Sequence, residues 1–243
     1  VPNYGPLAAV YVAEELGYYK QFGVQAEITA YRGGAAANQA LAAGEADLID
    51  FFPPGVALAV KKGVKERIVS PGSIAADSWH LVVLKDSPIK SVKDLAGRKV
   101  GITAKGSTTD FFALWAAKKG GGEIQTVPVG APGLIPALKG RQVDAVSMHS
   151  PLPLQLIAAG EGRSIVDYGK EIGPSLPDVW VASQAIIDQR PKALEGALRA
   201  IFKATRYLKE NRAYALKYLK NFTKEIDDKV ILLEYETAIM GRT

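Results

Sequence analysis

An internal repeat constrains the fold of this chain most strongly. Glycines, an Ala-Leu pair and an aspartate recur at an offset of 96 or 97 residues: Gly34, Ala40, Leu41, Gly44, Asp47 and Gly63 are followed by Gly130, Ala137, Leu138, Gly140, Asp144 and Gly160. In both copies a glycine loop leads to a helix, then to a strand beginning at an aspartate, then to a helix started by proline. The shared order predicts two α/β units of similar plan.

The remaining pattern adds a helical beginning and a helical tail. A helix is predicted from Pro6 to Gly17, and a strand follows at 24–28. Beyond Ser183 no clear strand pattern appears, and Pro191 starts a long amphipathic stretch. Helices of this kind are not stable alone, so the tail must pack on one of the two units.

Composition narrows the classes of function. The 243 residues are 48% hydrophobic, enough for one large domain or two lobes, and no apolar run approaches the roughly 20 residues of a membrane span. The sequence has no cysteine and two histidines, which excludes thiolate catalysis and cysteine zinc sites. The net charge of +5 is spread along helices and forms no basic patch with aromatic partners, so we expect no nucleic-acid partner.

The stretch 99–112 reads as a buried strand, a glycine turn and the start of a helix. Ser107 and Asp110 have the spacing of a capping box. A helix N-terminus offers unpaired N–H groups, so an anion can dock there, although a cap with nothing bound is the simpler interpretation. Ser107 stands where a phosphate loop has a lysine after its second glycine, which argues against a nucleotide phosphate site.

An ordered set of motifs resembles a known family. The set is Pro6, 12–20 (VAEELGYYK), 22–24 (FGV), 40–47 (ALAAGEAD), 91–101 (SVKDLAGRKVG), the Gly106-Ser107 turn and 140–145 (GRQVDA). In this order they resemble the type II solute-binding proteins of ABC importers, in the nitrate, sulfonate and taurine branch. The resemblance covers most of the chain up to about Arg190.

The resemblance implies an α/β fold of the two-lobed periplasmic binding protein type II class, with a ligand cleft between the lobes and a helical C-terminal tail. We expect lobe 1 at 1–82, lobe 2 at 83–181 and a returning part of lobe 1 at 182–243. The crossings are expected near 80–84 and 179–183, with Trp79, His80 and Trp180 at the hinges. Relatives also have a first strand that would precede Val1, and they continue past Thr243.

Loops that follow strands are the expected ligand contacts, because ligands of open α/β sheets lie beyond the carboxyl ends of strands. The candidates are Asn3, Tyr4, Arg32, Gly33, Gly34, Ala35, Phe52, Pro53, Ser107, Thr108, Thr109, His149 and Trp180.

Each candidate also has a structural interpretation. Asn3 and Tyr4 could cap the first helix, Gly33-Gly34 is first of all a turn, and one of two adjacent phenylalanines, 51 and 52, should face the core. His149 and Trp180 could be core residues. Asp47 and Asp144 occupy matched positions of the repeat, so we interpret them as architectural.

The expected function is non-catalytic. The protein would capture a small organic anion, a sulfonate or carboxylate with an aromatic or alkyl body, by hinge closure and deliver it to a membrane ABC permease. We expect a monomer without cofactor or metal, periplasmic or extracellular, soluble or lipid-anchored, with a signal segment that is not in this sequence. Two alternatives stay open: an enzyme on the same scaffold, similar to thiamine-pyrimidine synthases, and the effector-sensing domain of a transcription regulator.

Overall fold

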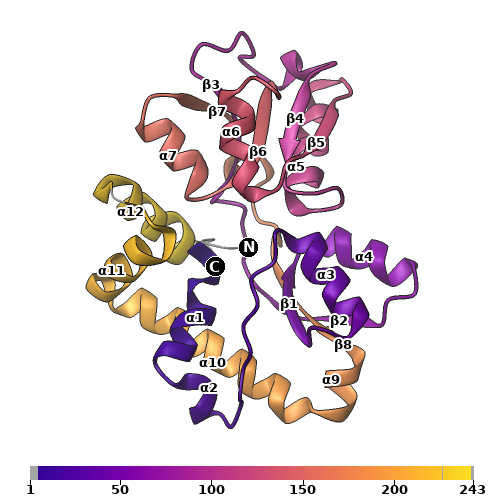
Figure 1. Ribbon diagram of the computed structural model, residues 1–243, viewed down its shortest axis with the longest axis vertical. Helices are drawn as coiled ribbons and strands as arrows, with labels where there is room; N and C mark the ends of the chain where they lie inside the picture. The colour runs from indigo at the N-terminus through magenta and orange to yellow at the C-terminus, as the bar shows by residue number, and fades with distance from the viewer. Residues whose placement is uncertain (1–4, 226, 242–243) are drawn as a thin grey trace.

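The computed structural model describes residues 5–225 and 227–241, and within them the strands form two separate sheets (Figure 1). A three-stranded sheet has the order β1-β8-β2, and a five-stranded sheet has the order β5-β4-β6-β3-β7. In Figure 1 the larger sheet and its helices lie at the top and the smaller sheet lies at the lower right. We call the two parts the five-stranded lobe and the three-stranded lobe.

The five-stranded lobe is built from the middle of the chain. Its strands are β3 (Trp79–Leu84), β4 (Lys99–Ile102), β5 (Gln125–Pro128), β6 (Ala145–His149) and β7 (Gly162–Asp167). β4 runs parallel to β5 and β6, whereas β3 is antiparallel to β6 and β7. The helices are α5 (Thr108–Gly120), α6 (Leu134–Lys139), α7 (Leu152–Ala158) and α8 (Tyr168–Ile172), with short turns at Val92–Leu95 and Ala131–Gly133. Apolar residues of α5 and α6 pack on opposite sets of strand residues to make its core.

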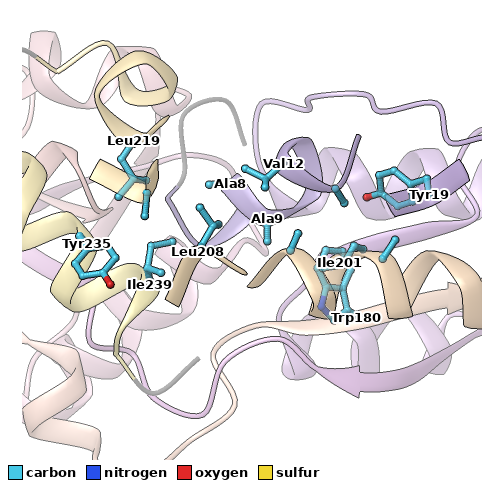
Figure 2. Packing of buried hydrophobic residues seen from close by; sticks show 14 of the residues in the cluster. Ala8, Ala9, Val12, Tyr19, Trp180, Ile201, Leu208, Leu219, Tyr235 and Ile239 are labelled. Carbon is cyan, nitrogen blue, oxygen red and sulfur yellow. The ribbon is translucent and has the colours of Figure 1, made fainter. Parts of the chain in front are cut away.

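The three-stranded lobe contains β1 (Leu48–Phe51), β2 (Glu66–Pro71) and β8 (Val179–Ser183), all antiparallel. Phe51 and Val179 face α3 (Gly34–Ala43) and α4 (Pro53–Lys61). Trp180 faces the other side, where it packs with α1 (Ala8–Glu15), α2 (Tyr18–Gln21) and the C-terminal helices (Figure 2). The sheet is therefore covered on both faces.

The C-terminal helices connect the lobes. They are α9 (Gln184–Gln189), α10 (Pro191–Glu210), α11 (Arg212–Thr223), α12 (Asp228–Glu234) and a π-helical turn, η4 (Tyr235–Ile239). α10 packs on α1 and α2 of the three-stranded lobe, as predicted for the tail, and α12 also contacts α7 of the five-stranded lobe. No helix in the described part of the chain is long and apolar enough to cross a membrane.

The internal repeat is confirmed by the order of elements. α3, β1 and α4 correspond to α6, β6 and α7, and prolines 53 and 151 lie at the start of the two final helices. β1 and β6 also have equivalent partners, because each pairs antiparallel with a strand that directly follows a crossing between the lobes, β8 and β3. The repeat thus places two similar units face to face.

Two expectations differ in detail from the structure. The stretch 24–28 is extended but, within the described residues, pairs with no strand. The residues expected to cross between lobes are themselves sheet strands, β3 in one lobe and β8 in the other. We keep the three-segment division as a proposal, with the crossings at 72–78 and 174–178.

Candidate functional site

A cavity of about 660 Å³ lies between the two lobes. From the three-stranded lobe it is lined by the Gly33-Gly34 turn, the end of β1 and the start of β8, and from the five-stranded lobe by Thr103, 107–109, Trp79 and His149. This size suits a small organic molecule. The cavity brings together seven of the predicted contacts, namely Gly33, Gly34, Ser107, Thr108, Thr109, His149 and Trp180.

The turn before α5 presents a closed network of hydroxyls. The Thr103 hydroxyl donates to Ser107 Oγ at 2.9 Å, and Ser107 Oγ donates to the carbonyl oxygen of Ala104 at 2.7 Å. Thr109 Oγ1 accepts from the Thr103 N–H at 2.9 Å and lies within hydrogen-bond distance of both other hydroxyls. The three side chains are buried and rigidly positioned by one another.

The capping box predicted for Ser107 and Asp110 does not form. The Ser107 side chain makes no cap hydrogen bond, and Asp110 Oδ2 accepts from the Gly106 N–H at 2.8 Å instead. The reason is local, because the Ser107 hydroxyl donates to the Ala104 carbonyl and its oxygen accepts from the Thr103 hydroxyl instead of from an N–H of the first helical turn. A true capping box forms at Ser91 and Asp94, ahead of the turn at Val92–Leu95.

The glycine turn before α3 faces this network across the cleft. A Cβ built on Gly33 would lie 3.3 Å from Thr103 Oγ1, so the two lobes are in contact here. At Gly34 a Cβ would lie 2.6 Å from the ring of Phe51, which packs in the core below the turn. Glycine is therefore required at position 34 by close packing, and it allows the lobes to approach at position 33.

His149 and Trp79 form the wall on the five-stranded side. The rings lie 5.2 Å apart in a T-shaped arrangement, and His149 is 2% exposed. Burial lowers the pKa of His149 to about 4, against a smaller opposing effect of the Ser150 carbonyl. His149 Nδ1 lies 2.7 Å from that carbonyl oxygen and must donate to it, so the neutral ring presents Nε2 as an acceptor.

Two carboxylates that the sequence analysis missed line the opposite wall. Asp50 pairs with Trp180 in the β1–β8 register, and Asp178 lies two residues before Trp180, so all three side chains project from one face of the sheet. Asp178 is 4% exposed and accepts from Ser73 Oγ at 3.3 Å. Burial, and then the charge of Asp178, raise the pKa of Asp50 well above its ordinary value. An aspartate inside an apolar strand was the available signal, because a buried carboxyl there is costly.

The other predicted contacts lie outside the lining of the cavity. Arg32 is exposed, and Ala35 and Pro53 are half-buried. Phe52 packs across the cleft instead, with its ring 5.3 Å from Phe111 and 5.6 Å from Phe112. Asn3 and Tyr4 fall outside the described residues. The architectural interpretation of Asp47 and Asp144 agrees with their contacts, an ion pair to Arg190 at 2.5 Å and a hydrogen bond from the Lys99 N–H at 2.8 Å.

The described residues contain no group of three histidine, aspartate or glutamate side chains arranged to hold a metal ion. The two lobes together supply the cavity with hydrogen-bonding atoms, carboxylates and aromatic walls.

Comparison with known proteins identifies the family. Residues 6–215 match the family described as NMT1/THI5 like. The chain belongs to this family. One relative of this chain is a putative binding protein of Brucella abortus, which is 23% identical over 92% of this chain and 70% of the relative. The taurine-binding periplasmic protein of Escherichia coli is 23% identical over 85% of this chain and 65% of its own length.

Solved structures show the fold. The alkanesulfonate-binding protein SsuA from Xanthomonas axonopodis superposes with a TM-score of 0.84 at 20% identity, over 98% of this chain and 82% of that protein. This chain thus has the two-lobed periplasmic binding protein fold. An enzyme shares it, because the desulfurization enzyme DszB superposes with a TM-score of 0.64 at 18% identity, over 96% of this chain and 82% of that enzyme.

Proposed function

We propose that the protein is the solute-binding component of an ABC importer and captures a small organic molecule between its lobes. The observation that carries this proposal is the 660 Å³ cavity lined from both lobes. A site divided in this way couples ligand binding to lobe closure, because the ligand touches both walls only when they meet. Relatives named for the binding of taurine and alkanesulfonates support the same role.

Capture by closure agrees with the contacts across the cleft. Gly33 lies against Thr103, and Phe52 lies against Phe111 and Phe112. These contacts join the lobes in the closed form, which the permease would recognise. We further propose that the protein acts as a monomer in the periplasm or outside the cell, soluble or lipid-anchored.

The sequence predicts an organic anion as the ligand, and the observations on ligand charge point in two directions. Relatives named for sulfonates and taurine support an anion. The side chains of the cavity do not, because its described lining has five acidic residues and one arginine.

The enzyme alternative finds less support in the site. A thiol nucleophile is absent from the sequence, and the Nδ1 proton of His149 is held by the adjacent Ser150 carbonyl instead of by a carboxylate. We therefore propose no catalytic step. The regulator alternative would use the same cavity to sense an effector, and it differs from the transport role only in its partner.

A thermal-shift panel tests solute capture. Sulfonates, carboxylates, nitrate and small amines are added at millimolar concentration, and a solute at 100 times its Kd should stabilise the protein by about 2.7 kcal/mol. Gly33→Val should abolish the shift while the unliganded melting temperature is retained, because the added methyls meet Thr103 across the cleft.

Ala43→Val, at the far end of α3, is the matched control and should respond as the parent does. The proposal fails if every solute leaves the parent unchanged. An undiminished shift in Gly33→Val would remove this part of the cleft from the site.

A further inference from the structure

The charges around the cavity are unevenly distributed. Its described lining includes the acids Glu27, Glu45, Asp47, Asp50 and Asp178, and Arg190 as the basic residue. Arg190 is already engaged with Asp47 at 2.5 Å, and burial keeps His149 neutral near pH 7. Acidic residues of the lining therefore outnumber basic ones even when the pair of Asp47 and Arg190 is set aside, and this balance favours a cationic ligand over an anion.

The two innermost carboxylates are placed to act together. Asp50 lies opposite Trp180 on the neighbouring strand and Asp178 lies two residues before it, both on the same face of the sheet, and the charge of Asp178 acts on Asp50. None of the ion pairs among the described residues includes Asp50. A cationic ligand group would relieve the repulsion between the pair, and an anion would increase it.

The three hydroxyls of the network opposite this pair have no proton left for an anion. Its protons go to Ser107 Oγ, to the Ala104 carbonyl and, from Thr109, back into the network. Lys105, the cation of the turn, donates to Thr126 Oγ1. The hydroxyls of the network thus offer mainly lone pairs, and lone pairs suit N–H groups.

Resting on the proposed role in solute capture, we propose that the ligand carries a cationic nitrogen group, an ammonium or amidinium, bound by Asp50 and Asp178 with its body against Trp79 and Trp180. The cavity forms the binding site, and the carboxylates of Asp50 and Asp178 select a positively charged ligand. The tryptophans come from opposite lobes, so a flat cation held between them gains contact with an aromatic face on closure.

Two probes of similar shape and opposite charge test the charge preference. Benzamidine and benzoate are titrated separately by calorimetry at pH 7.5, with benzenesulfonate as a second anion. Benzamidine should bind at least about tenfold more tightly than either anion. Asp50→Asn and Asp178→Asn should each weaken benzamidine about tenfold or more, and both amides keep the shape of the site.

Asp86→Asn is the matched control, because Asp86 is an exposed acid in the other lobe, paired with Arg141. It should leave the affinity for benzamidine within twofold. Since Asp178 also accepts from Ser73, circular dichroism of each variant confirms folding, and Asp50→Asn gives an independent answer if Asp178→Asn unfolds.

The outcomes separate the two proposals. Preferential binding of benzoate or benzenesulfonate overturns the charge inference and leaves solute capture intact. Benzamidine binding that both amide variants retain overturns the assignment to Asp50 and Asp178. Failure of all three probes, together with an unresponsive thermal-shift panel, contradicts solute capture itself.

Discussion

Glu234 is a fully buried carboxyl at the junction between the C-terminal helices and both lobes. A Cβ on Gly5 would lie 1.9 Å from Glu234 Oε1, so the N-terminal turn packs directly on the carboxyl and requires glycine at that position. Burial raises the pKa of Glu234 to about 8, and hydrogen bonding to Ser150 and to the Gly5 backbone lowers it by less. At neutral pH the side chain is therefore mostly protonated.

The protonated carboxyl predicts that stability falls as the pH rises. Between the ordinary value of 4.5 and the folded value of about 8, the native state holds a proton that the unfolded state has released. The free energy of unfolding should then fall by up to about 1.4 kcal/mol per pH unit in this window. Glu234→Gln imitates the protonated form, so it should match the parent at pH 5 and exceed it by a few kcal/mol at pH 8.5.

Urea unfolding at pH 5, 7 and 8.5 measures this difference. Glu236→Gln is the matched control, since Glu236 lies two residues further along the chain and is exposed. It should follow the pH dependence of the parent. Parallel curves for the parent and Glu234→Gln would show that the carboxyl is ionised in the native state.

At the scale of elements, the stretch 24–30 is an extended segment without a ladder among the described residues. Val24, Ala26 and Ile28 alternate with exposed residues and pack on the core formed with α1 and α10. Their side chains thus follow the pattern of a half-buried strand, while the cavity separates the segment from β1.

Because the segment 24–30 has no strand partner among the described residues, its backbone amides should exchange hydrogen fast. In the chain of 243 residues, amides at 25–30 should exchange at least about tenfold faster than those at 179–183, because β8 is paired on both sides. Exchange of backbone amides followed by mass spectrometry on peptides from the two segments measures the ratio. Similar protection of both segments would show that 24–30 has acquired a strand partner.

The same segment shows what sequence patterns can predict. Apolar alternation reported the burial of Val24 and Ile28 correctly, because alternation reflects which side chains face the core. Hydrogen bonding between strands also requires a neighbouring strand. The alternation of apolar residues in one segment does not show whether such a neighbour exists. Helix boundaries were predictable for the opposite reason: Gly17, Gly44 and Pro53 end or begin helices through their own backbone preferences.

The site was predictable where its residues lie at the carboxyl end of an extended segment. Gly33 follows the segment 24–30, Ser107 follows β4 and His149 ends β6, and all three reach one cavity. Asp50 and Asp178 were missed because their importance arises from the antiparallel register of β1 and β8, which join residues far apart in the sequence. The contacts of Ser107 were mispredicted because its hydroxyl joins Thr103 and the Ala104 carbonyl instead of accepting from the first turn of the helix.

For the whole molecule, Phe52 connects the lobes through an aromatic contact. It lies at the end of β1, and its ring is packed against Phe111 and Phe112 at the start of α5. In the proposed mechanism this contact exists only in the closed form, so it adds to the free energy of closure and little to the stability of either lobe.

Phe52→Ala should therefore shift the protein toward the open form. Aromatic pairs contribute about 0.5–1.5 kcal/mol beyond burial, which corresponds to a change of about two- to tenfold in the closed population. The affinity for any solute that requires closure should fall by the same factor. Small-angle scattering should show a larger radius of gyration for the unliganded variant, and saturating solute should restore the value of the parent.

Phe202→Ala provides the comparison for a lost phenylalanine, because Phe202 is 43% exposed on α10. It should change neither the radius of gyration nor the affinity. If Phe52→Ala lowers the melting temperature as much as a core substitution and leaves both other quantities unchanged, Phe52 stabilises the fold and the lobes do not separate at this contact. Closure would then depend on other contacts across the cleft, such as the one between Gly33 and Thr103.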